Sequence, residues 1–92
     1  MEQTAFVSLK NKWEDLDDLL TSSLTSATTY SFECHGPCGC LVQFGSSKPT
    51  DMAGIKLDAD GIKLLSYTIG TDNIYVRGIG GVSTLNIVKT SE

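Results

Sequence analysis

The residues best suited to chemistry lie together in the run Cys34-His35-Gly36-Pro37-Cys38-Gly39-Cys40. Thiolates and imidazoles are the ligands that zinc prefers in tetrahedral sites. Structural zinc sites usually take two ligands from one such segment and two from a second, and this chain has no second segment. We therefore expect no bound metal and no cofactor, although four residues stay as metal candidates: Cys34, His35, Cys38 and Cys40.

The same cysteines fit a structural role. Cys34 continues an alternating apolar run that precedes it, and Cys40 begins the alternating run that follows it. Free cysteine is among the most buried residue types, so we expect both to be small core residues on either side of a turn. A disulfide or redox role is the other alternative, but three cysteines within seven residues do not resemble a secreted disulfide framework. We expect His35 at the surface.

Two further patterns only superficially suggest ligand binding. An acidic cluster lacks the glycine and the terminal glutamate of a calcium-binding EF-hand loop, and a solvated helix face explains it better. The run Gly78-Ile79-Gly80-Gly81 has no following Lys-Ser/Thr pair, so it is predicted to be a turn. With one histidine and no nucleophile motif, the sequence does not predict an enzyme. The acidic cluster comprises Glu14, Asp15, Asp17 and Asp18.

The composition is typical of one small globular domain. The chain has 92 residues, 40% of them hydrophobic and 20% charged, with a net charge of −4. The absence of a basic stripe argues against nucleic-acid binding. No apolar run approaches the ~20 residues of a membrane helix, and the first residues do not resemble a signal peptide. We therefore expect synthesis in a cytosol, without nucleic-acid or membrane partners.

A period-two alternation of apolar and polar residues, interrupted by turn residues, dominates the chain from residue 28 onward. It predicts a mainly β fold, a small antiparallel β-sandwich or barrel of about six strands with a short N-terminal helix or arm. We expect an arm over residues 1–27 and a β-sandwich domain over 28–92. The predicted strands are 28–34, 39–44, 52–57, 61–67, 73–78 and 83–89.

A repeated tetrapeptide suggests one pairing between strands. The letters Gly-Ile-Lys-Leu occur at 54–57 and again at 61–64, separated by Asp58-Ala59-Asp60. Asp-Gly pairs favour the left-handed conformations of tight β-turns. We therefore expect these two segments to pair as a hairpin.

The N-terminal region shows helical spacing. Residues 1–9 form either a short strand or an arm, and Asn11 is predicted to cap a helix of two or three turns, with Glu14 in the capping-box position. So short a helix is not stable alone, and its apolar stripe must pack against something. The stripe consists of Trp13, Leu16, Leu19 and Leu20.

The order of these features resembles the small β-rich virion proteins of tailed bacteriophages. These proteins occur as capsid decoration (cement) proteins and as modules of head or tail fibres. The similarity runs from about Trp13 to Val88. The matching segments are Trp-x-x-Leu-x-x-Leu-Leu from Trp13, Thr-Thr-Tyr at 28–30, Lys48-Pro49-Thr50-Asp51, Ala53-Gly54-Ile55-Lys56-Leu57, Asp72-Asn73-Ile74-Tyr75-Val76-Arg77-Gly78 and Thr84-Leu85-Asn86-Ile87-Val88.

The resemblance implies a non-enzymatic virion structural protein that is assembled in the host cytoplasm. The first hypothesis is a capsid decoration protein that binds and stabilises neighbouring capsid subunits. The alternative is a module of a tail or collar fibre. The implied partners are other virion proteins, above all the major capsid protein, and further copies of this chain, with a trimer as the expected oligomer.

Aromatic residues and arginine dominate interface energetics, so the expected contacts are the apolar stripe together with Tyr75 and Arg77. For Arg77 an ordinary surface position is an equal alternative. Two readings from other classes remain open. One is a small carbohydrate- or ligand-binding β-domain, with a site lined by Trp13, Tyr67 and Tyr75. The other is a zinc-dependent domain.

Overall fold

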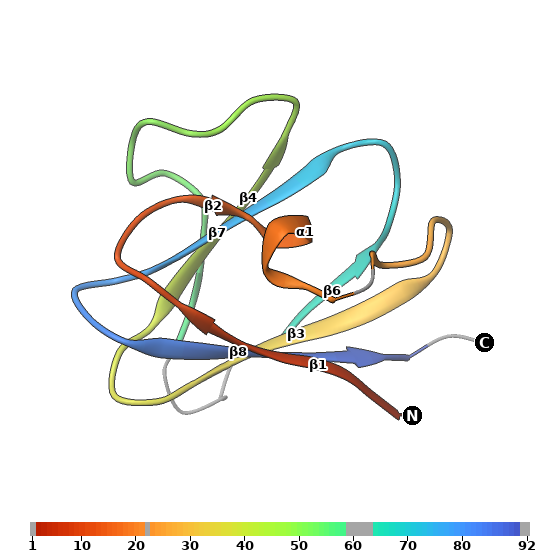
Figure 1. The fold of residues 1–92 in the computed structure, drawn as a ribbon, viewed down its shortest axis with the longest axis horizontal. Coiled ribbons are helices and arrows are strands. Elements are labelled where there is room, and N and C mark those ends of the chain that lie inside the picture. Colours follow the sequence, from red (N-terminus) through yellow and green to blue (C-terminus); the bar gives the residue numbers. More distant parts are fainter. Residues whose placement is uncertain (1, 22, 59–63, 91–92) are drawn as a thin grey trace.

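The computed structural model describes residues 2–21, 23–58 and 64–90, and its fold is mainly β. Two antiparallel sheets of four strands each form a sandwich (Figure 1), so the expected sandwich is confirmed and a closed barrel is not formed. The elements are β1 (Glu2–Leu9), β2 (Glu14–Asp15), α1 (Leu16–Leu19), β3 (Thr29–His35), β4 (Cys40–Gly45), β5 (Ile55–Leu57), β6 (Leu64–Thr68), β7 (Asn73–Gly78) and β8 (Ser83–Lys89).

The chain changes sheet at nearly every connection. The first sheet has the order β1-β8-β3-β6, and the second has the order β2-β7-β4-β5. Only the connection from β4 to β5 stays within one sheet. Because Glu2 pairs with Lys89, the two ends of the described chain lie side by side, as Figure 1 shows.

The core lies between the two sheets, and the period-two alternation explains which side chains enter it. In β3, buried and partly exposed residues alternate along the whole strand. Successive side chains of a strand point to opposite faces, so one face of each sheet is apolar. The two apolar faces pack against each other. The core contains Leu9, Leu16, Tyr30, Phe32, Cys34, Cys40, Val42, Leu57, Ile74, Val76, Leu85 and Ile87.

The N-terminal region is part of the sandwich, so the expected arm over residues 1–27 is not formed as a separate unit. β1 pairs with β8 along its length, and β2 pairs with β7. The strand alternative for residues 1–9 is therefore the one observed. The described residues form eight strands instead of about six, because β1 and β2 add one strand to each sheet.

The N-terminal helix is shorter than expected. α1 has four residues, and its cap is Asp15, whose carboxylate accepts a hydrogen bond from the Asp17 backbone N–H at 3.1 Å, instead of Asn11. Residues 14 and 15 are paired with β7 as a strand, so a helix cannot begin before Leu16. No helix of the described chain is long and apolar enough to span a membrane.

The predicted hairpin of the repeated tetrapeptide rests mostly on residues outside the described chain, so it stays a prediction. β5 pairs with β4 in the second sheet, whereas β6 pairs with β3 in the first. Leu57 is fully buried opposite Cys40, and this packing commits β5 to the second sheet. In β5 the alternation predicted the shared face of Ile55 and Leu57, both of which pack into the core, but it did not predict the partner strand. Residues 59–63, which include the predicted turn and the start of the predicted strand 61–67, lie outside the described residues.

Candidate functional site

The cysteine segment lies where the chain crosses from the first sheet to the second. Cys34 ends the core face of β3, Cys40 begins the core face of β4, and both side chains are fully buried. Gly36 has φ +110°, a left-handed conformation that glycine adopts without strain, and it makes the turn between them. The prediction that Cys34 and Cys40 are core residues on either side of a turn is confirmed.

Burial changes the acidity of the two core thiols. Desolvation raises the pKa of Cys34, and it raises the pKa of Cys40 further, with the neighbouring Cys34 as a second cause. Both thiols are therefore protonated at neutral pH, and a protonated thiol is a poor nucleophile and a poor metal ligand. All three cysteines are free. Among the described residues, no group of three or more His, Cys, Asp or Glu side chains is arranged to hold a metal ion.

His35 faces the opposite way from the core cysteines. Its side chain is 41% exposed, which agrees with the expected surface position, and its Nε2 contacts the Glu33 carboxylate. The ring also lies 6.1 Å from the Phe6 ring, centre to centre. His35 is thus part of the outer surface of the first sheet and does not join the thiols in one site.

A second apolar cluster covers the outer face of the second sheet. Trp13 packs against Leu41 and Tyr75, and each of the three is less than 8% exposed. The indole Nε1 donates a 2.6 Å hydrogen bond to the backbone oxygen of Asp51. Trp13 precedes α1 instead of lying on it, so the loop between β1 and β2 acts as a cover for this sheet.

Arg77 holds the same loop. Its guanidinium donates to the backbone oxygen of Asn11 at 2.9 Å and to the side-chain oxygen of Asn11 at 2.8 Å. The guanidinium carbon also lies 6.0 Å from the centre of the Trp13 ring, at the outer limit of a cation–π contact. Asn11 in turn accepts from the Gly80 backbone N–H, which links the β1–β2 loop to the β7–β8 turn.

The predicted contact residues are thus largely used inside the chain. Leu16 is 2% exposed in the main core, and Leu19 and Leu20 pack against that core while partly exposed. Tyr67 lies on the other sheet, stacked on Phe44 with ring centres 4.0 Å apart. The three aromatic residues Trp13, Tyr67 and Tyr75 therefore do not line a common site.

Sequence reasoning missed three residues of the Trp13 cluster, namely Leu41, Asn11 and Asp51. A signal for Leu41 was present, because an apolar residue between the inward-facing Cys40 and Val42 must point outward and needs a cover. Asp51 contributes a backbone oxygen, and Asn11 contributes its backbone and side-chain oxygens to a partner 66 residues away, which no local pattern reveals.

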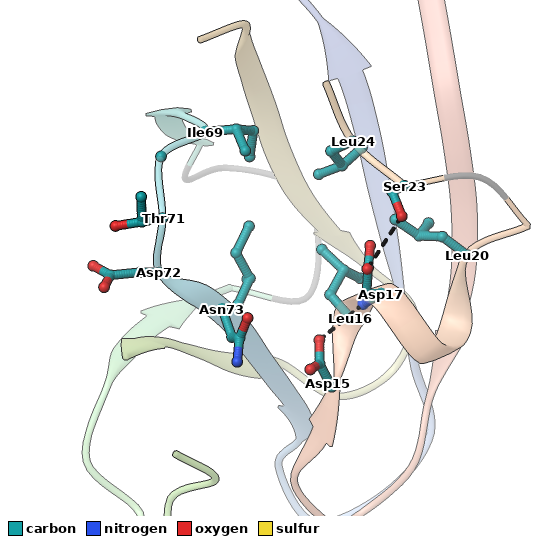
Figure 2. A pocket seen from close by; sticks show the side chains of 12 residues that line it. Asp15, Leu16, Asp17, Leu20, Ser23, Leu24, Ile69, Thr71, Asp72 and Asn73 are labelled. Atoms are coloured by element: carbon teal, nitrogen blue, oxygen red, sulfur yellow. Dashed lines mark hydrogen bonds between the residues drawn. The ribbon is translucent and has the colours of Figure 1, made fainter. Parts of the chain in front are cut away.

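A small hollow lies between α1, the following segment and the β6–β7 loop (Figure 2). Its volume is about 180 Å³, below the usual range of roughly 300–1,000 Å³ for small-molecule sites. Leu24 and Ile69 point toward it, whereas Thr71 and Asp72 are directed away. On its rim, Ser23 donates to the Asp17 carboxylate at 3.1 Å.

The outer face of the first sheet has no comparable cover among the described residues. Its side chains alternate with the buried ones of β3 and β8, and they are mostly small and polar. Phe6 stands on this face with 58% of its surface exposed. We call this surface the open face. It consists of Phe6, Ser8, Ser31, Glu33, His35, Ser66, Thr68, Thr84, Asn86 and Val88.

Comparison with protein-family models, with curated proteins and with solved structures finds no match for this chain. The open face, with its exposed aromatic ring, is therefore the candidate functional surface on structural grounds alone.

Proposed function

We propose that the protein is a non-enzymatic structural component of a tailed-bacteriophage virion, a capsid decoration protein that binds neighbouring subunits of the major capsid protein and stabilises them. It would be assembled onto the particle in the host cytoplasm as an oligomer. The proposal begins from the sequence resemblance. It is supported by the mainly β sandwich and by the structural roles of the reactive side chains.

Those side chains serve the fold. Cys34 and Cys40 are protonated core residues, and Arg77 fixes the loop that carries Trp13. His35 is bonded to Glu33 on the surface. Because these reactive groups serve the fold itself, we expect the protein to act through the shape of its surface.

The observation that carries the proposal is the contrast between the two outer faces. The second sheet is covered by the Trp13 cluster, whereas the open face of the first sheet presents Phe6 among small polar side chains. A sheet face of small residues allows close approach of another protein, and an aromatic anchor supplies most of the binding energy of such contacts. We therefore place the capsid contact on the open face.

The test uses co-sedimentation with empty capsids assembled from the phage's major capsid protein. Ser31 lies on the central strand β3, with Ser66 and Val88 as its neighbours on either side. An arginine at this position stands above small neighbours without entering the core. Ser31→Arg should abolish sedimentation with capsids. Thr71→Arg, on an exposed loop at the end of the sandwich, should leave it unchanged.

Two results would contradict this reading. If the unmodified protein stays in the supernatant with capsids but sediments with purified tails, the fibre-module alternative replaces decoration. If Ser31→Arg still sediments with capsids as the unmodified protein does, the open face is not the contact surface.

A further inference from the structure

The first sheet ends in one long free edge. Among the described residues, the eight-residue strand β1 is paired only with β8, and nothing pairs with its other side. The other edge strand of the first sheet, β6, has five residues, and the edge strands of the second sheet, β2 and β5, have two and three. A strand paired on one side leaves half of its backbone N–H and C=O groups directed outward, where another strand can bind them.

Little in the sequence of β1 protects this edge. The stretch Gln3–Leu9 contains no charged residue and no proline, which are the usual devices that prevent edge pairing. An irregularity between Gln3 and Ala5 interrupts the register with β8, but Ala5–Leu9 pairs regularly. Phe6 lies in this regular part and is exposed.

We propose that β1 is a self-association site, at which it pairs antiparallel with β1 of a second copy around a two-fold axis at Phe6. Such an addition joins two four-stranded sheets into one continuous sheet, and the contact is isologous because both copies offer the same segment. Each Phe6 would then lie opposite its counterpart on the open face, and the two rings would form one aromatic patch beside the small polar residues of that face.

The register around Phe6 matches residues of like character. On the core side it brings Ala5 opposite Val7, both of which are only partly buried in the single chain. At the two ends it brings position 2, a glutamate, opposite position 10, a lysine. Opposite charges at matched positions favour the antiparallel pairing of two identical segments and disfavour a parallel one.

This matching is the reason to choose a second copy as the partner. A free edge that binds an unrelated strand would not need opposite charges at its own two ends. The proposal goes beyond the decoration role, because two-fold pairing requires no capsid, and it differs from the trimer that the sequence resemblance implies.

The first experiment measures the mass of the purified full chain by light scattering after size-exclusion chromatography, over a series of concentrations. A mass twice that of the chain is expected for the unmodified protein. Phe6→Lys should give the monomer, because a lysine opposite a lysine repels and blocks the edge. Met52→Lys places the same charge at another exposed apolar residue, in the β4–β5 loop, and should remain dimeric.

A monomeric or trimeric unmodified protein would overturn the proposal, as would a dimer that survives Phe6→Lys in a protein with an unchanged circular dichroism spectrum. Neither result depends on capsid binding, so this failure and that of the decoration role are distinguishable.

The second experiment tests the register by cross-linking in a Cys38→Ser background, in which the remaining native cysteines are buried. Residues directly opposite across an antiparallel pair have Cβ atoms about 5 Å apart, within reach of a disulfide. Phe6→Cys should therefore oxidise to a covalent dimer. Ser8→Cys, exposed on the same face, would lie about 13 Å from its counterpart and should not. Equal cross-linking of both variants would reject the two-fold at Phe6.

Discussion

Replacement of Trp13 by alanine gives the sharpest test of how this sandwich is stabilised. The indole is 7% exposed and packs on Leu41 and Tyr75, and its Nε1 is bonded to the backbone oxygen of Asp51. Trp→Ala substitutions at buried sites cost about 3–5 kcal/mol, and the lost hydrogen bond accounts for about 1 kcal/mol of that. Because the cluster lies on the outer face of a sheet, water can enter the vacated space, and we expect about 3 kcal/mol.

That loss is large for a chain of this size. Domains of 92 residues are stable by roughly 5–14 kcal/mol, and each 1 kcal/mol shifts the melting temperature by about 4–8 °C. Trp13→Ala should therefore lower the melting temperature by at least about 10 °C, as measured by far-ultraviolet circular dichroism. Trp13→Phe keeps most of the packing and should cost about 1–2 kcal/mol. Val82→Ala, at an exposed position, serves as the control and should change stability by less than about 0.5 kcal/mol.

A melting curve of Trp13→Ala that matches the control would refute the reasoning. It would mean that the packing of Trp13 on the second sheet contributes nothing to the folded chain. If capsid binding were lost at the same time, Trp13 would be a contact to a partner, as the sequence first suggested.

Four other predictions concern the cysteine segment and the loops at Gly81 and Asn11. In the folded protein a thiol reagent at pH 8 should modify Cys38 and spare the buried Cys34 and Cys40 until the chain unfolds; early modification of all three would contradict their burial. Folding raises the pKa of Cys34 and Cys40, so the folded state binds their protons more tightly, and stability should fall as pH rises above about 8.5. Denaturant titrations should show a steeper fall than in a Cys34→Ala/Cys40→Ala variant; equal slopes would count against these two groups. A Cβ on Gly81 would stand 2.7 Å from the Cys38 Sγ, so Gly81→Ala should cost about 1–3 kcal/mol, and Cys38→Ala should recover most of it; additive effects would exclude this contact. Asn11→Ala removes the acceptor shared by Arg77 and Gly80 and should cost about 1 kcal/mol in urea unfolding, whereas Asn11→Asp should retain most of that stability.

The sequence was sufficient for the fold class and for most core faces. Alternation around Phe32 and Val42 predicted which side chains are buried, because the direction of a side chain in a strand depends only on its position along the strand. The partner of a strand depends on residues far away in the chain. The pairing of β5 with β4 and of β6 with β3 therefore could not be predicted from the identical tetrapeptides at 54–57 and 61–64.

The same limit explains the N-terminal region. Trp13 and Leu16 are spaced as on one helix face, but a two-residue strand between them directs Trp13 to the outer face of the second sheet and Leu16 into the core. A strand as short as β2 shows no periodicity. Its pairing with β7 becomes visible only in three dimensions. The open face could not be predicted either. Polar residues at alternate positions indicate that a strand face is exposed, but they do not indicate which sheet face lacks a cover.

The order of strands in the first sheet has a consequence for how the protein folds during its synthesis. β8 lies between β1 and β3, so β1 does not pair with β3. β3 can first pair with β6, whereas β1 has no partner in the described chain before residues 83–89. On the ribosome, β1 emerges early and remains without its neighbour until β8 has been synthesised. Contacts between such distant segments form slowly, so β1, whose residues 3–9 carry no charge, stays unpaired and prone to aggregation until β8 is made.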